Sequence, residues 1–91
     1  MSVYAAFDEG PGVQVASNKG WGDICRLINI YGGRYSKQLA ATGVCEHMGL
    51  LVDELRELMA HASESEESTL EGLIEALEGQ ELVLITDGMQ T

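Results

Sequence analysis

The chain has 91 residues, 45% of them hydrophobic, and it carries a formal net charge of −10 at pH 7. This length and apolar content predict one small folded domain over residues 1–91 and exclude a chain that is disordered throughout. The acidity excludes direct contact with nucleic acid or with an anionic membrane, because binding to phosphate groups requires lysine and arginine.

The first third of the sequence predicts a β-hairpin followed by a helix. Strands are expected over residues 3–7 and 13–17, the second of which alternates apolar and polar residues, and a Gly-Pro-Gly turn separates them. Asp23 is typical of an N-cap, and the apolar residues that follow it recur at intervals of three and four. These features predict a helix over residues 23–31.

The middle of the chain combines an ambiguous segment with a clear helix. In residues 34–44, Ser36 is a candidate cap for a short helix that runs through Ala41 and is closed by Gly43. The next segment, residues 45–62, has an apolar stripe at helical spacing and is predicted to be one continuous helix.

The last third predicts a loop, a helix and a strand. Residues 63–68 are polar and are expected to form a flexible loop. Ser68 and Glu71 match a capping box, which predicts a helix over residues 69–78. The apolar run that follows predicts a strand over residues 82–86.

Together these elements predict an α+β fold: a two-layer sandwich whose small, mainly antiparallel, three-stranded sheet is covered on one face by the helices. The last strand is apolar on both faces, which is typical of a covered strand. It is therefore expected either between the first two strands or with its outer face against a second copy of the chain, as in a homodimer. The tail, residues 89–91, is expected to fray.

We expect a cytoplasmic protein without a membrane span. The N-terminus lacks the basic and apolar regions of a signal peptide, and the apolar runs are far too short to cross a bilayer. Two cysteines, Cys25 and Cys45, are too few for a disulfide framework and fit free thiols in a reducing compartment.

The negative charge is concentrated in one part of the chain. Residues 53–81 hold ten acidic residues and one base, Arg56, whereas acids and bases balance over residues 1–52. Most of these acids fall on two predicted helices, away from the apolar stripes, and six of them are the candidate partner-binding residues: Glu71, Glu75, Glu78, Asp53, Glu54 and Glu57. The alternative is a solvated surface without a partner.

Trp21 is a further candidate for partner binding. It is the single tryptophan and lies between two glycines. Tryptophan is enriched among the residues that dominate protein interfaces, so an exposed anchor is one interpretation. The other is a lid that packs over the first helix.

No set of residues predicts catalysis, a metal ion or a cofactor. The spacing of the cysteines and histidines matches no zinc motif, and calcium-loop, phosphate-loop and dinucleotide motifs do not occur. A buried, unreactive thiol is the favoured interpretation for Cys25, and His47 and His61 are expected on the shoulders of helices. We therefore expect no enzyme.

These observations predict a small, acidic, intracellular protein-binding domain that serves as an adaptor, assembly factor or inhibitor and presents an acidic helical face to a basic protein surface. The alternative is a nucleic-acid-mimicking, phage-type inhibitor of a nuclease or a CRISPR-like effector, whose carboxylates copy the spacing of phosphates. A third class, an enzyme or small-ligand binder, requires a pocket lined by perturbed titratable groups, and the sequence shows no such convergent set.

Overall fold

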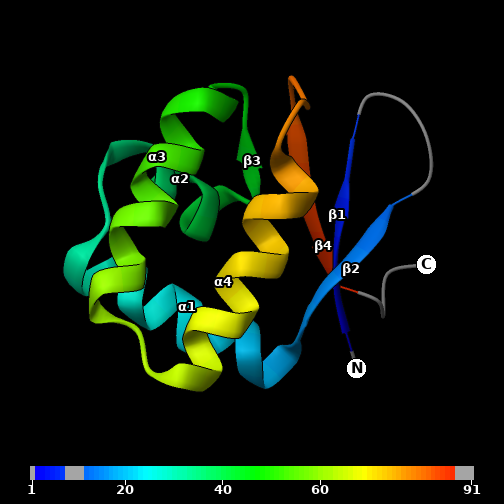
Figure 1. Cartoon of the computed structure of the whole chain (residues 1–91). Coiled ribbons are helices and arrows are strands. Elements are labelled where there is room, and N and C mark those ends of the chain that lie inside the picture. Colours follow the sequence, from blue (N-terminus) through cyan, green and yellow to red (C-terminus); the bar gives the residue numbers. More distant parts are fainter. Residues whose placement is uncertain (1, 8–11, 88–91) are drawn as a thin grey trace.

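The computed structural model of the chain describes residues 2–7 and 12–87. Two strands come first, then two helices, a very short strand, two more helices and a last strand (Figure 1). The elements are β1 (Ser2–Ala6), β2 (Val13–Ser17), α1 (Asn18–Tyr31), α2 (Arg34–Thr42), β3 (Val44–Cys45), α3 (Met48–Leu58), the 3-10 turn η1 (Met59–His61), α4 (Glu64–Leu77) and β4 (Val83–Asp87).

The predicted α+β class is confirmed, with one strand more than expected. Over the described residues the sheet has the order β2-β1-β4-β3, and each neighbouring pair is antiparallel. The added strand, β3, is two residues long, which is too short for alternation to reveal it. It pairs Val44 with Leu84 and Cys45 with Val83.

Strand β4 is internal in the sheet, but it does not have the first of its two expected placements. It lies between β1 and β3, while β2 forms the edge beyond β1, so the predicted position between the first two strands is wrong. The inner face of β4 presents Val83 to the core, whereas Leu84 is 43% exposed on the other face. A second copy of the chain against that outer face stays a prediction.

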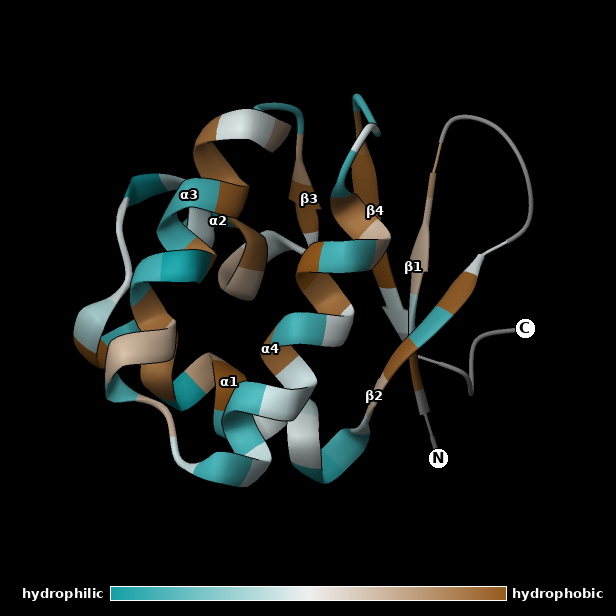
Figure 2. Ribbon diagram, viewed as in Figure 1, coloured by the Kyte–Doolittle hydropathy of each residue, from teal (hydrophilic) through white to brown (hydrophobic). Residues whose placement is uncertain are grey.

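The helices lie on one side of the sheet and enclose the core between the two layers (Figure 1). The sheet contributes Ala5, Cys45 and Val83, each with no exposed surface. Hydrophobic residues line the inner sides of the helices, where the ribbon is brown in Figure 2, and polar residues face outward. The amphipathic periodicity of the helices explains why their apolar sides face the sheet and their polar sides face outward, because the apolar stripe of each helix is buried where it faces the other layer.

Helix α1 begins five residues earlier than predicted. Ser17, not Asp23, is its N-cap, and the Ser17 hydroxyl accepts a hydrogen bond of 3.0 Å from the Gly20 N–H. The segment 18–22, with two glycines, therefore forms the start of the helix. Each helical glycine costs about 1 kcal/mol relative to alanine, and the packing of Trp21 against the core offsets part of this cost.

The short helix expected within residues 34–44 is confirmed as α2, although Ser36 is not its N-cap. The helix starts after Gly33, and Ser36 lies in its first turn, where the hydroxyl accepts a hydrogen bond of 2.9 Å from the Gly33 N–H. Gly43 closes the helix as predicted, in a left-handed conformation with φ of 78°.

The helix predicted over residues 45–62 is interrupted at both ends. Cys45 belongs to β3, α3 starts at Met48, and residues from Met59 onward tighten into the 3-10 turn η1. Sequence periodicity did not mark the first boundary, because Cys45 is buried in the sheet as an apolar residue would be in a helix.

The predicted flexible loop over residues 63–68 is wrong, since this segment opens helix α4. Ser63 and Glu66 form the capping box that was expected at Ser68 and Glu71. Three acids in the first turn favour an earlier start, because negative charge stabilises a helix N-terminus. The predicted fraying of residues 89–91 lies outside the described residues.

The capping box makes the start of α4 sensitive to acid. Hydrogen bonds from the backbone N–H and the hydroxyl of Ser63 lower the pKa of Glu66 below its usual 4.5. A lowered pKa in the folded state stabilises the fold above pH 4.5, and this contribution is lost as the pH falls through the folded-state value.

We therefore expect Glu66→Gln to destabilise the protein at neutral pH and to do so progressively less in acid. Thermal unfolding of both proteins between about pH 6 and about pH 3 measures this difference. A destabilisation that is constant over this range would contradict the assigned role of the carboxylate.

Candidate functional site

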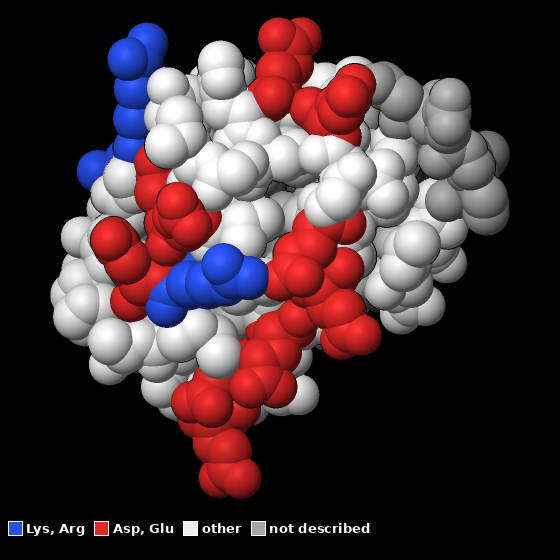
Figure 3. Space-filling model, turned by 45° about the horizontal axis from the view of Figure 1, so that its top comes forward, with Lys and Arg blue, Asp and Glu red and all other residues white. Residues whose placement is uncertain are grey.

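Helices α3 and α4 pack against each other and bring their acidic side chains onto one side of the molecule. Figure 3 shows a band of carboxylates and a second acidic group beside it, with a basic side chain between them. The six acids predicted on these helices do not all have the same role, because two of them contact other parts of the protein.

Glu54 is a structural residue. Its carboxylate accepts hydrogen bonds from the backbone N–H groups of Tyr35, at 3.2 Å, and Ser36, at 2.7 Å. These donors lie in the first turn of α2, where the backbone N–H groups have no partner within the helix. Gly33, the N-cap, has no side chain to serve this purpose, so Glu54 caps α2 from another helix. It is therefore not available to a partner.

Glu78 is partly neutralised within the protein. One of its oxygens lies 2.6 Å from a guanidinium nitrogen of Arg56, the single base between residues 53 and 81. Both side chains are more than half exposed, and such surface ion pairs contribute about 0 to 1 kcal/mol. The pair therefore contributes little to stability, and a cation from a partner can compete for Glu78.

Four predicted carboxylates remain exposed, and within the part of the chain that the structure describes they have no hydrogen bond or ion pair. We call these four residues the acidic face: Asp53 and Glu57 on α3, and Glu71 and Glu75 on α4. Each helix contributes two carboxylates spaced four residues apart, so that the Cβ atoms of each like-charged pair lie about 5 to 6 Å from each other. This spacing disfavours each helix by a few tenths of a kcal/mol per pair.

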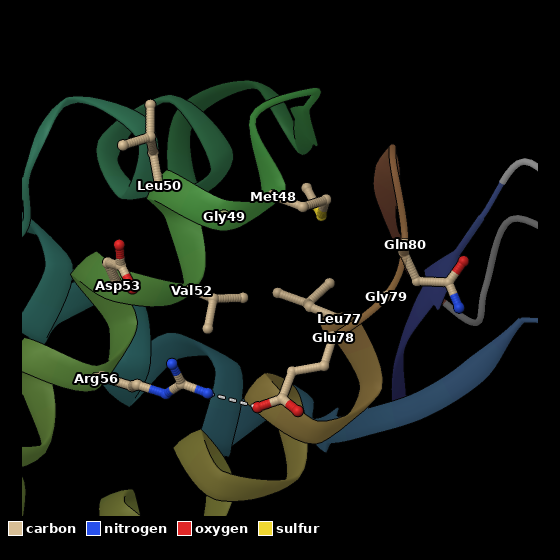
Figure 4. A pocket seen from close by; sticks show the side chains of 10 residues that line it. All are labelled: Met48, Gly49, Leu50, Val52, Asp53, Arg56, Leu77, Glu78, Gly79 and Gln80. Atoms are coloured by element: carbon tan, nitrogen blue, oxygen red, sulfur yellow. Dashed lines mark hydrogen bonds and ion pairs between the residues drawn. The ribbon is translucent and has the colours of Figure 1, made fainter.

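A groove of about 540 Å³ opens beside the acidic face, between the start of α3 and the end of α4 (Figure 4). Its floor is apolar and consists of Met48, Val52 and Leu77, all buried. Asp53 and Glu78 stand on opposite walls of the groove. Sequence reasoning missed this feature, although the exposed Leu50 and the glycines Gly49 and Gly79 at its edges gave a weak signal.

Trp21 does not belong to the acidic face. It is partly buried and packs against the core, but it lies within helix α1 itself and so is not a lid over that helix. Together with Val3 and Ile85 it lines a smaller cavity of about 280 Å³ near the sheet. Its role as an anchor for a partner stays a prediction.

The histidines and cysteines lie apart from the groove. His61 stacks on Tyr31 with 3.8 Å between ring centroids, and His47 lies against Tyr35. Cys45 is buried in β3, and burial raises the pKa of the half-buried Cys25 thiol, which makes it less reactive at neutral pH. Over residues 2–7 and 12–87 no three acidic, histidine or cysteine side chains converge as metal ligands do.

Among the described residues, no helix has the length and apolarity needed to cross a membrane. The chain was compared with protein-family models, with curated proteins and with solved structures, and none of the three comparisons gives a match. The fold and the site thus define a class only: a small α+β domain with an acidic face and an adjoining apolar groove on two packed helices. Its function has to be argued from that geometry.

Proposed function

We propose that this protein is a small protein-binding domain that presents its acidic face to a basic protein surface, as an adaptor, assembly factor or inhibitor. The observation that carries the proposal is a set of four exposed carboxylates on two adjacent helices that have no hydrogen bond or ion pair with any of residues 2–7 and 12–87. The single arginine of that region is already bound to a fifth carboxylate, Glu78.

Uncompensated repulsion is the reason to prefer a binding role to a merely solvated surface. A surface selected only for solubility mixes charges of both signs, which avoids repulsion between neighbours along a helix. Here the bases Lys19, Arg26, Arg34 and Lys37 all precede the acidic segment, and they lie on α1 and α2. A partner with positive charge would remove the repulsion on binding and would be attracted over a long range.

The second candidate, a nucleic-acid mimic that inhibits a nuclease or a CRISPR-like effector, is less well supported. It needs a long row of free carboxylates, and the roles of Glu54 and Glu78 within the protein shorten that row. The two candidates differ in a direct test: double-stranded DNA or RNA would displace a mimic from its target. Displacement would favour the second candidate.

The two free cysteines fit a reducing compartment, and we place the proposed activity in the cytoplasm.

The partner is first captured with the wild-type chain from an extract of its source cells and is then purified. A capture that fails with Glu71→Gln and Glu75→Gln but succeeds with wild type identifies a partner of the acidic face.

The association rate with that purified partner is expected to fall about tenfold or more between low and physiological salt, because ions screen exposed charges beyond about 8 to 10 Å. Stopped-flow or surface-based kinetics at several salt concentrations measures this effect. A rate that does not change with salt would contradict an electrostatic mechanism.

A further inference from the structure

The groove next to the acidic face combines an apolar floor with negative walls. Met48 and Val52 from α3 and Leu77 from α4 point toward one another across the floor (Figure 4). Its volume of about 540 Å³ lies within the range of cavities that hold ligands, and it is open to solvent along its length. An apolar side chain placed there would be removed from water, which is favourable in proportion to the area buried.

Two glycines keep the groove open. A Cβ atom added at Gly49 or at Gly79 would meet no other atom of residues 2–7 and 12–87 within 4 Å. A glycine is favoured at position 79 for another reason, because its backbone has a positive φ of 83°. Gly49 has no such need, since it lies in the first turn of helix α3, where other residues are also accepted.

The walls of the groove carry negative charge, which favours binding of a cation. Asp53 and Glu78 stand on either side of the apolar floor. Helix α4 also ends at this groove, and its last turn contains no basic residue. The partial negative charge of that helix end therefore adds to the two carboxylates, while Arg56 contributes a positive charge to the lining.

We infer that the groove receives an apolar side chain from a basic amphipathic segment of the partner, whose lysines or arginines contact Asp53, Glu78 and the acidic face. The inference rests on the proposed function and deepens it, because it names the chemistry of the partner: alternating apolar and basic residues on one face of a helix. Charge steers the encounter, and burial of the apolar side chain holds the complex.

Two synthetic helical peptides with the same number of lysines test the inference. One carries leucines along one face, and the other carries alanines there, which preserves helicity and charge but removes the anchor. The leucine peptide is expected to bind the wild-type protein at least tenfold more tightly by calorimetry. The methyl signals of Met48, Val52 and Leu77 are expected to shift in NMR spectra on binding of this peptide.

A variant that fills the groove tests whether the apolar side chain of the peptide binds there. Gly49→Met adds a long apolar side chain at a residue that lines the groove, and it is expected to remove the preference for the leucine peptide. The control is Gly22→Met: Gly22 is also a helical glycine, and an added Cβ would meet no described atom within 4 Å, but it lies on α1 beside the smaller cavity of Trp21 and not at the groove. Both variants replace glycine by a better helix former, so thermal unfolding should show folds at least as stable as wild type.

Each failure has a distinct meaning. Equal binding of the leucine and alanine peptides, or a leucine preference that survives Gly49→Met, would overturn the groove inference and leave the acidic face as the binding surface. A leucine peptide with glutamines in place of lysines that binds equally well would overturn the basic character of the occupant. Binding of both lysine peptides that is insensitive to Glu71→Gln with Glu75→Gln would count against the proposed function itself.

Discussion

Reversing two charges on helix α4, by Glu71→Lys together with Glu75→Lys, is expected to weaken binding of the purified basic partner by a hundredfold or more. The reversal changes the charge of the acidic face by four units and replaces attraction by repulsion for an incoming cation. Like charges brought together in an interface cost several kcal/mol, and about 1.4 kcal/mol corresponds to a tenfold change in affinity. Calorimetry at physiological salt measures the change.

Two matched double variants test whether binding depends on where the charges lie or only on the net charge of the protein. Glu71→Gln with Glu75→Gln removes two negative charges from the acidic face, and Asn29→Lys with Ala41→Lys adds two positive charges at exposed positions on α1 and α2. Both pairs change the net charge of the protein equally. We expect the first pair to weaken binding strongly and the second to have a small effect. Equal effects of the two pairs would mean that only the net charge matters and that the acidic face is not a site.

Replacing Glu54 by alanine is expected to lower the free energy of unfolding by about 2 kcal/mol, although this residue looks like its acidic neighbours in the sequence. The carboxylate accepts two backbone hydrogen bonds at the start of α2, of 2.7 and 3.2 Å. Hydrogen bonds to a charged group contribute about 1.5 to 3 kcal/mol, and the negative charge also suits the N-terminal end of the helix. For a domain of this size the loss corresponds to a fall in melting temperature of about 10 °C.

Glu57→Ala is the control for this effect. Glu57 lies on the same helix and is exposed, and among the described residues it has no hydrogen bond or ion pair. Its removal changes the net charge by the same amount, and it is expected to alter stability by no more than about 0.5 kcal/mol. Chemical denaturation of the two variants compares them directly. Similar stabilities of Glu54→Ala and Glu57→Ala would show that the cap contributes little.

Regular periodicity made much of this fold predictable. The apolar stripes at intervals of three and four residues identified the helices, alternation identified strand β2, and apolar runs identified strands β1 and β4, because spacing along the chain determines which side chains share a face. The boundaries were less predictable. Ser17 and Asp23 are both good caps, as are Ser63 and Ser68, and local preference does not decide between them.

The candidate site was predictable in composition but not in detail. Counting charges identified the acidic segment, and amphipathic spacing placed its carboxylates away from the core. The roles of Glu54 and Glu78 depend on contacts between residues 18 to 22 positions apart in the chain. Neither contact leaves a periodic signal, and the groove between α3 and α4 exists only when the two helices pack.

The sequence by itself determined the α+β class, the amphipathic helices and the concentration of negative charge after residue 52. These properties depend on spacing and composition, which are local. Only the tertiary structure decided that Val44 and Cys45 extend the sheet, that Glu54 caps another helix, and that four carboxylates lie exposed beside an apolar groove. The physical reason is that such features arise from the packing of segments distant in the chain, whose geometry a one-dimensional pattern does not contain.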